Sequence, residues 1–339
     1  MGKGKFLYHI YALAVTAVWG TTFISSKVLM NAGFSPTGVF VLRSLIAYIC
    51  MWTLLTAKHK KGSSKFWAKN LRDEFYFLLL GISGGSLYFL AENTAVSYTQ
   101  ASHVSFIVGT VPLITALATI AVKKYFKGKI ADGLEDVKFS WNLLLGTVLC
   151  MVGMAMIIFE GASAETDAVS APHPVLGDFL ALLAAAWWAL YSILAGQLTS
   201  EYGSLFATRK VFFWGLVTII PFVLHDASTT STIDGGSTWG LLYDGSASLP
   251  SLLCNGKVLF NLLFLGLLAS FIGYVVWNRV MAALGNVTST NYIYLNPFFT
   301  LIAAVLVLGE SLTVIGTLGS LAIIGGVILA GGKKIELKI

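Results

Sequence analysis

A series of ten hydrophobic stretches, each about as long as a lipid bilayer is thick, constrains this chain more than any other feature. A helix needs about 20 consecutive apolar residues to cross the hydrocarbon core. The stretches occupy residues 6–31, 35–57, 74–98, 101–122, 141–160, 175–198, 208–225, 258–281, 287–308 and 312–332. The mean hydropathy of +0.79 is far above that of a soluble domain. We therefore predict an all-α integral membrane protein with ten transmembrane helices and almost no sequence left for a soluble domain.

The positions of the lysine and arginine residues predict the orientation of these helices. With the N-terminus in the cytoplasm, 19 of the 22 basic residues fall in cytoplasmic loops or tails. Lys257 falls in an outer loop, and Lys27 and Arg43 fall within helices. This is the positive-inside pattern. It predicts a multi-pass protein of the cell (inner or plasma) membrane with both termini cytoplasmic, and it explains the net charge of +6 without nucleic-acid binding.

The ten stretches form one set of five that occurs twice. Leu145-Gly146-Thr147 matches Ile315-Gly316-Thr317 at an offset of 170 residues, and Trp19 matches Trp188 at an offset of 169. The region from Tyr88 to Pro112 matches the region from Tyr274 to Pro297 at an offset of 185 to 186. Because five is an odd number, the second set must enter the membrane inverted, an arrangement typical of secondary transporters.

Two inverted repeats of five helices are thus expected, at residues 6–160 and 175–332. Residues 226–257, which are rich in Ser, Thr and Gly, are expected to form an extracytoplasmic loop. The first stretch is about twice as long as the apolar core of a signal peptide and lacks a cleavage site, so it is expected to be the first helix.

Several short motifs occur in the same order as in a known family. They are Trp19-Gly20-Thr21-Thr22-Phe23, Arg43, Glu92-Asn93-Thr94-Ala95, Ala101-Ser102, Pro112, Pro297 and Leu308-Gly309-Glu310. In this order the chain resembles the drug/metabolite transporter superfamily, in its ten-helix branch with two EamA-type repeats. The resemblance implies export or exchange of small metabolites, such as amino acids, through a central cavity that opens alternately to each side of the membrane.

Four polar or aromatic residues are expected near the middle of the membrane, where transporters of this architecture hold their substrates. They are Trp19, Tyr88, Trp188 and Asn296, placed by counting about 1.5 Å of rise per helical residue. Indole and phenol rings offer apolar walls with one polar group, and an amide facing lipid would be left without partners. We predict that these four residues line a substrate site, although ring packing and a helix–helix hydrogen bond of Asn296 are alternatives of similar weight.

Two prolines, Pro112 and Pro297, fall at matching places in the two repeats and near the same depth. Proline inside a helix removes one backbone hydrogen bond and bends the helix. Each is therefore predicted to kink its helix, which would serve either motion or a fixed bend.

Four ionisable residues are expected together in the outer third of the membrane: Lys27, Arg43, Glu92 and His103. An unpaired charge at depth costs roughly 2.5 to 3.5 kcal/mol. Arg43 and Glu92 are therefore expected to form an ion pair, with Lys27 extending toward the membrane surface and His103 nearby. The pair predicts an outer gate or a proton-coupled site at Glu92, and a structural ion pair is the alternative.

The inverted counterpart of Glu92 is Asn278, so the inner end cannot form the same pair. No P-loop and no zinc-binding motif occurs in the sequence, so neither a cofactor nor a bound metal is expected.

The expected partners are the lipid bilayer, a small-molecule substrate and protons, in either a monomer or a homodimer. The sequence therefore predicts a secondary transporter and not an enzyme. A nucleotide-sugar or phosphorylated-metabolite exchanger, an intramembrane enzyme and a membrane receptor are the alternatives.

Overall fold

A computed structural model describes residues 3–58, 66–98, 104, 107–137, 140–164, 173–234, 254–303 and 314–331. Every regular element within these residues is a helix. Six helical spans are long and apolar enough to cross a membrane: Lys5–Asn31, Pro36–Ala57, Leu71–Tyr98, Val175–Tyr202, Ser204–His225 and Gly256–Leu284. Trp141–Met156 and Val314–Ala330 are shorter apolar helices. The prediction of an all-α membrane fold is confirmed, while the segments expected at 101–122 and 287–308 are described only as shorter elements.

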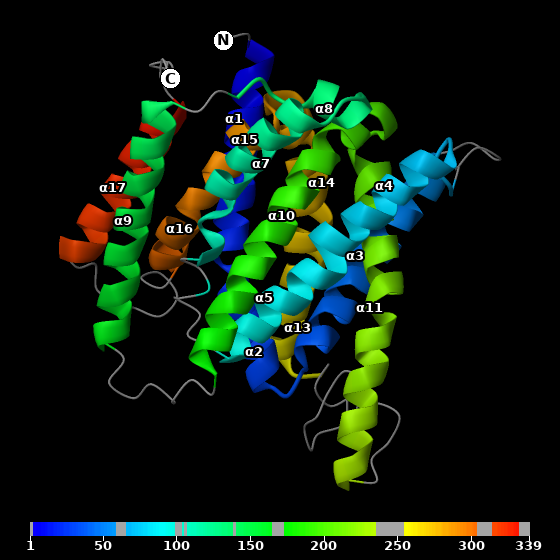
Figure 1. The fold of residues 1–339 in the computed structure, drawn as a ribbon. Coiled ribbons are helices and arrows are strands. Elements are labelled where there is room, and N and C mark those ends of the chain that lie inside the picture. Colours follow the sequence, from blue (N-terminus) through cyan, green and yellow to red (C-terminus); the bar gives the residue numbers. More distant parts are fainter. Residues whose placement is uncertain are drawn as a thin grey trace.

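The first half of the chain contains these elements: α1 (Lys3–Gly20), α2 (Thr22–Asn31), α3 (Pro36–Lys58), α4 (Leu71–Gly81), the π-helix η1 (Ile82–Ser86), α5 (Leu87–Tyr98), α7 (Val111–Tyr125), α8 (Lys129–Gly133) and α9 (Trp141–Ala164). The second half contains α10 (Pro174–Tyr202), α11 (Ser204–Asp234), α13 (Gly256–Leu263), the π-helix η2 (Phe264–Gly273), α14 (Tyr274–Leu284), α15 (Asn286–Thr290), the 3-10 helix η3 (Asn291–Leu295), α16 (Asn296–Ala303) and α17 (Val314–Gly331). The long helices run side by side in alternating directions (Figure 1).

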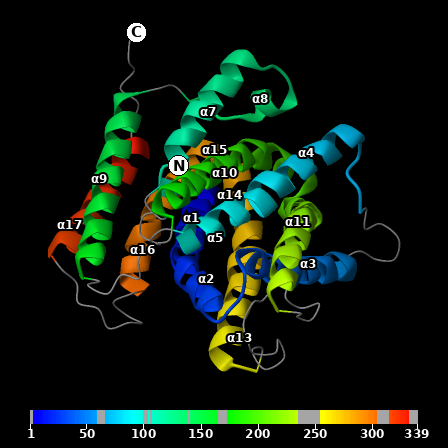
Figure 2. The same cartoon turned by 60° about the horizontal axis from the view of Figure 1, so that its bottom comes forward.

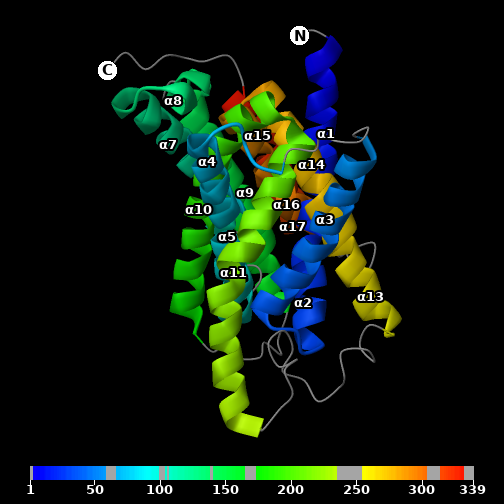
Figure 3. The same ribbon diagram turned by 90° about the vertical axis from the view of Figure 1, so that its right-hand side faces the viewer.

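One end of the molecule carries the start of α1 and the end of α17, and we call it the terminal end (Figure 1). Seen from the side, α8 lies at this same end as the start of α1 (Figure 3). The two repeats are joined there by hydrogen bonds. The Glu135 carboxylate accepts from Val287 N and Thr288 N, and Asn286 Nδ2 donates to Thr119 Oγ1 at 2.6 Å.

A π-helix interrupts the corresponding helix of each repeat. The first, η1, ends two residues before Tyr88, and the second, η2, ends directly before Tyr274. Each π segment provides a backbone carbonyl to a ring of the core. The Tyr274 hydroxyl donates to Gly84 O at 2.9 Å, and the Trp19 indole donates to Ala269 O at 3.1 Å. Such π segments often occur at functional sites.

The helices α9 and α17 pack against each other and stand to one side of the other helices, as two views agree (Figure 2). Glycines let their backbones approach closely. A Cβ atom added at Gly326 would lie 2.5 Å from Cys150 Sγ and 2.6 Å from Gly146 O. No residue of this pair is among the described residues that line the central cavity.

The two prolines expected to kink helices instead lie where helices begin. Pro112 occupies the first turn of α7. Pro297 is the second residue of α16, directly after the 3-10 helix η3. The N–H groups in the first turn of a helix have no acceptor within that helix, so proline fits there without the loss of a hydrogen bond. The helical path therefore changes at these points by a break between elements and not by a bend inside an α-helix.

Candidate functional site

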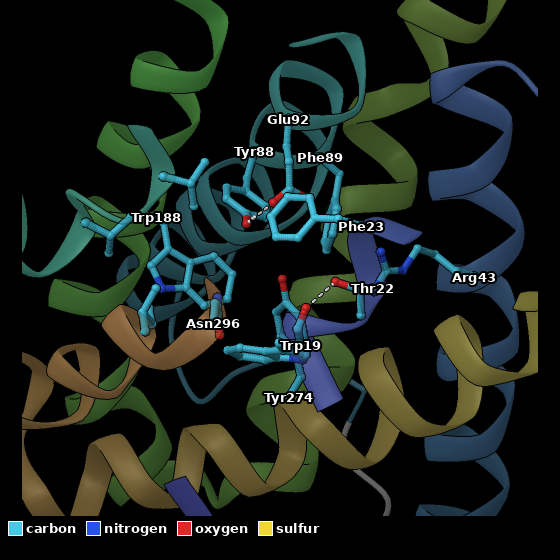
Figure 4. Close-up of a pocket in the computed structure, with 13 residues that line it drawn as sticks. Trp19, Thr22, Phe23, Arg43, Tyr88, Phe89, Glu92, Trp188, Tyr274 and Asn296 are labelled. Carbon is cyan, nitrogen blue, oxygen red and sulfur yellow. Dashed lines mark hydrogen bonds between the residues drawn. The ribbon is translucent and has the colours of Figure 1, made fainter. Parts of the chain in front are cut away.

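A cavity lies between the two halves of the chain. It has a volume of about 450 Å³, a figure that includes the space open to solvent. The first half lines it with residues of α1, α2, α3, α5 and α7, and the second half with residues of α10, α14, η3 and α16. All four residues proposed above as a substrate site, Trp19, Tyr88, Trp188 and Asn296, line this cavity (Figure 4). Their role in binding stays a prediction.

Aromatic rings from both repeats meet at the cavity. Trp19 and Trp188, which occupy matching positions, pack edge to face with their ring centroids 5.3 Å apart. Tyr88 packs against Trp188 at 4.8 Å, and Tyr274 packs against Trp19 at 5.5 Å. Edge-to-face and tilted contacts at these distances are favourable because the positive edge of one ring meets the negative face of another. The rings hold one another and leave apolar walls toward the cavity.

Arg43 and Glu92 both line the cavity, but the ion pair expected between them does not form. The described residues include three ion pairs, and Arg43–Glu92 is not among them. Arg43 Nε instead donates to Ser270 Oγ at 2.8 Å, and its guanidinium lies 4.5 Å from the centroid of the Phe89 ring. Glu92 Oε1 accepts a hydrogen bond from the Tyr88 hydroxyl at 2.6 Å. Tyr88 precedes Glu92 by one helical turn, so it is a closer partner than a residue on α3.

Lys27 is not among the described residues that line this cavity. Lys27 is exposed on α2. His103 lies outside the described residues, so its predicted place beside Glu92 is not described.

The inverted counterpart of Glu92 has neutral hydrogen-bond partners within the described residues. Asn278 Oδ1 accepts from the Tyr191 hydroxyl at 2.6 Å, and Asn278 Nδ2 donates to Thr208 Oγ1 at 2.9 Å. These bonds tie α14 to α10 and α11. The predicted asymmetry between a carboxylate in one repeat and an amide in the other thus corresponds to two different environments, a cavity wall and a packed core.

Several lining residues were not predicted as site residues from the sequence. They are Thr22, Phe23, Phe89, Val108, Val111, Tyr274 and Ile293. A signal was available for Tyr274, because it is the counterpart of Tyr88 at the repeat offset of 186 residues. Phe89 follows Tyr88 in the chain, and its contact with Arg43 comes from the packing of α5 against α3.

The apolar spans define a polytopic membrane protein with a cavity between its two halves. The chain belongs to the EamA-like transporter family. The sequence pattern of this family matches the chain twice, over residues 6–159 and over residues 175–332. The protein is thus a membrane transporter of this family, as the resemblance of its motifs implied.

Relatives of the same length are themselves named as transporters. An uncharacterized transporter of Archaeoglobus fulgidus is 24% identical over 96% of this chain and 98% of its own. A "Probable terminal-alkyne amino-acid exporter" of Streptantibioticus cattleyicolor is 23% identical over 96% of this chain and 94% of its own. A "Probable amino-acid metabolite efflux pump" of Escherichia coli is 26% identical over 52% of this chain and 55% of its own.

A crystal structure of another protein has the same fold. It superposes with a TM-score of 0.66 at 14% identity and covers 96% of this chain and 97% of its own. At this identity the likeness concerns the fold alone.

Proposed function

We propose that this protein is a secondary active transporter that exports or exchanges small metabolites such as amino acids. The observation that carries the proposal is the cavity lined by corresponding helices of the two halves, with Trp19 and Trp188 in edge-to-face contact. In transporters with inverted repeats, the substrate site lies between the repeats and each repeat in turn opens toward one side. The names of two relatives, one an amino-acid exporter and one an amino-acid metabolite efflux pump, favour the same substrate class.

The terminal end is proposed to face the cytoplasm, in line with the distribution of basic residues. The hydrogen bonds of Glu135 and Asn286 between the two halves at that end would then act as the inner gate. Substrate would reach the Trp19–Trp188 site from the cytoplasm when these bonds break and would leave by the opposite end when they re-form.

Glu92 is proposed as the residue that couples transport to protons. It is buried, it lines the cavity, and Tyr88, Arg43 and Tyr274 are the described titratable groups that face it. Asn278 takes its place in the second repeat and cannot bind a proton in this way. Protonation of one carboxylate would therefore distinguish the two ends of the transport path.

Transport into lipid vesicles that contain the purified protein tests this proposal. We expect uptake of labelled neutral amino acids above that of protein-free vesicles, and faster uptake when a pH gradient is imposed. Glu92→Gln should lose the acceleration of uptake by the gradient. If the folded protein takes up no metabolite, the proposed transport function is wrong. An unchanged pH response in the variant would contradict only the proposed role of Glu92.

An exchanger of nucleotide sugars or phosphorylated metabolites receives less support. Such substrates carry several negative charges and require a cluster of basic side chains. Arg43 is the basic residue among the described residues that line the cavity, and Glu92 lines the same cavity. The lining thus favours a substrate without a net negative charge.

A further inference from the structure

We propose that the cavity recognises zwitterions, with Arg43 binding the carboxylate of the substrate and Glu92 binding its ammonium group. This inference rests on the proposed function, because it assumes that the cavity holds the transported molecule. It goes further by assigning each charge of the substrate to one side chain.

Arg43 is fixed in a way that leaves its terminal nitrogens for a ligand. Its Nε donates to Ser270 Oγ, and its guanidinium carbon lies over the Phe89 ring, so both contacts hold the side chain. The two terminal nitrogens have no hydrogen-bond partner among the described residues. A guanidinium has five N–H donors, and two parallel N–H groups match the two oxygens of a carboxylate. Arg43 extends from α3 toward the cavity, opposite Trp188 (Figure 4).

Glu92 also retains a free binding position. One carboxylate oxygen, Oε1, accepts the Tyr88 hydroxyl, and in the described part of the chain Oε2 has no partner. The Tyr88 bond fixes the orientation of the carboxylate, so that Oε2 is left for a donor in the cavity. An ammonium group with three N–H donors is a suitable partner.

The two opposite charges share one cavity but form no direct ion pair. Both side chains are buried, and an uncompensated buried charge is unfavourable. A substrate with a single negative charge would satisfy Arg43 and be repelled by Glu92, and a simple amine would satisfy Glu92 and be repelled by Arg43. A molecule with both a carboxylate and an ammonium group compensates both side chains at once and adds no net charge to the membrane interior.

The remaining lining is aromatic and apolar, and it suits the rest of such a molecule. The faces of Trp19, Tyr88 and Trp188 attract cations, which adds to the binding of an ammonium group beside Glu92. Val108, Val111 and Ile293 provide apolar surface. The substrate class that fits all of these features is a neutral α-amino acid with an apolar or aromatic side chain.

A comparison of matched ligands tests the assignment. Binding to the purified protein in detergent would be measured by calorimetry for L-leucine, for L-leucinamide, which lacks the carboxylate, and for N-acetyl-L-leucine, which lacks the ammonium group. The same three forms of L-phenylalanine provide a second series. The wild-type protein is expected to bind each free amino acid at least about tenfold more tightly than its two derivatives.

The variants separate the two charges. Arg43→Gln should abolish the preference for the amino acid over the amide, whereas Glu92→Gln should abolish the preference over the N-acetyl form. Glu92→Gln should in addition bind N-acetyl-L-leucine more tightly than the wild-type protein does, a gain that a misfolded protein cannot give. Arg43→Lys keeps a cation and should keep part of the preference, and Lys27→Gln, at an exposed position on α2, should change none of the three affinities.

The proposal would be overturned if the wild-type protein bound the three forms with equal affinity. It would also be overturned if each variant reduced the affinity for all three ligands by the same factor. If vesicles with the protein transport another kind of metabolite while neither amino acid binds, zwitterion recognition is refuted and the transporter function stands. If nothing is transported and nothing binds, both are refuted.

Discussion

At the scale of single residues, the two tryptophans at matching repeat positions differ in what their indole N–H groups do. Trp19 Nε1 donates to Ala269 O, whereas Trp188 Nε1 is buried and has no hydrogen-bond partner among the described residues. Both rings pack against aromatic neighbours. The same substitution should therefore have different consequences at the two positions.

Trp19→Phe keeps a ring but leaves the Ala269 carbonyl without its partner, which costs about 1 to 3 kcal/mol. Trp188→Phe removes no such bond and should destabilise the protein less. Thermal unfolding of both variants in the same detergent measures the difference. An equal or larger loss of stability in Trp188→Phe would show that the Trp19 hydrogen bond does not contribute as described.

A buried ion pair near the terminal end provides a second residue-scale prediction. Lys210 Nζ lies 2.5 Å from Glu74 Oε1, and Lys210 is fully buried. Glu74→Ala leaves this ammonium group unpaired and should destabilise the protein by about 3 to 5 kcal/mol. Adding Lys210→Met removes the unpaired charge, so the double variant should unfold at a higher temperature than Glu74→Ala. A double variant less stable than the single one would refute the pairing.

At the scale of helices, close backbone contact holds α9 and α17 together. Two adjacent glycines allow a matched test, because only one of them faces the partner helix closely. A Cβ atom at Gly326 would lie 2.6 Å from Gly146 O, whereas a Cβ atom at Gly325 would meet only Leu149 Cδ2, at 3.7 Å.

Gly326→Ala should therefore separate the two helices and lower the unfolding temperature, since overpacking costs about 1 to 3 kcal/mol. Gly325→Ala should be nearly neutral or slightly stabilising, because alanine favours the helix more than glycine does. Unfolding followed by fluorescence or by light scattering compares the two. Equal effects of the two substitutions would contradict the packing of α9 on α17.

How far the sequence predicts this fold and site can be judged from particular residues. The depth of Trp19, Tyr88, Trp188 and Asn296 follows from counting helical residues, and all four line one cavity. Counting along a helix gives depth but not the direction in which a side chain points around the axis. That direction depends on packing between helices far apart in the chain. The bond between Arg43 and Ser270, 227 residues away, could not be predicted for this reason.

Hydrogen bonds between side chains on the same helix could have been predicted from the sequence. Tyr88 and Glu92 are four residues apart on one helix, a spacing that brings their side chains together. The expected Arg43–Glu92 pair was wrong because it assumed that equal depth implies contact. The two π-helices were not predicted from the sequence, although each precedes one of the matching tyrosines.

At the scale of the whole molecule, the hydrogen bonds of Glu135 connect the two halves at the terminal end. Its carboxylate accepts from two backbone N–H groups of α15 and from Thr288 Oγ1, the last at 2.6 Å. Glu135 lies in the first half of the chain and α15 in the second. If the halves move relative to one another, these bonds must break.

Glu135→Ala should therefore shift the protein toward the state that is open at the terminal end. A cysteine introduced at Asn296 should then react faster with a thiol reagent added from that side, by about threefold or more. Asp136→Asn, at the neighbouring exposed residue, serves as the charge-matched control and should leave the rate unchanged. Identical labelling rates in Glu135→Ala and the control would contradict a gate at this end.

The central claim is that the cavity between the two halves carries the substrate, and exchange of solute across a membrane tests it most directly. Vesicles containing the protein would be loaded with unlabelled L-leucine and placed in labelled L-leucine, and accumulation of label would be measured. We predict transient accumulation with the wild-type protein and with Trp141→Ala, at an exposed site on α9, and at least a tenfold loss with Trp188→Ala. Full accumulation with a folded Trp188→Ala variant would contradict the assignment of the cavity as the transport site.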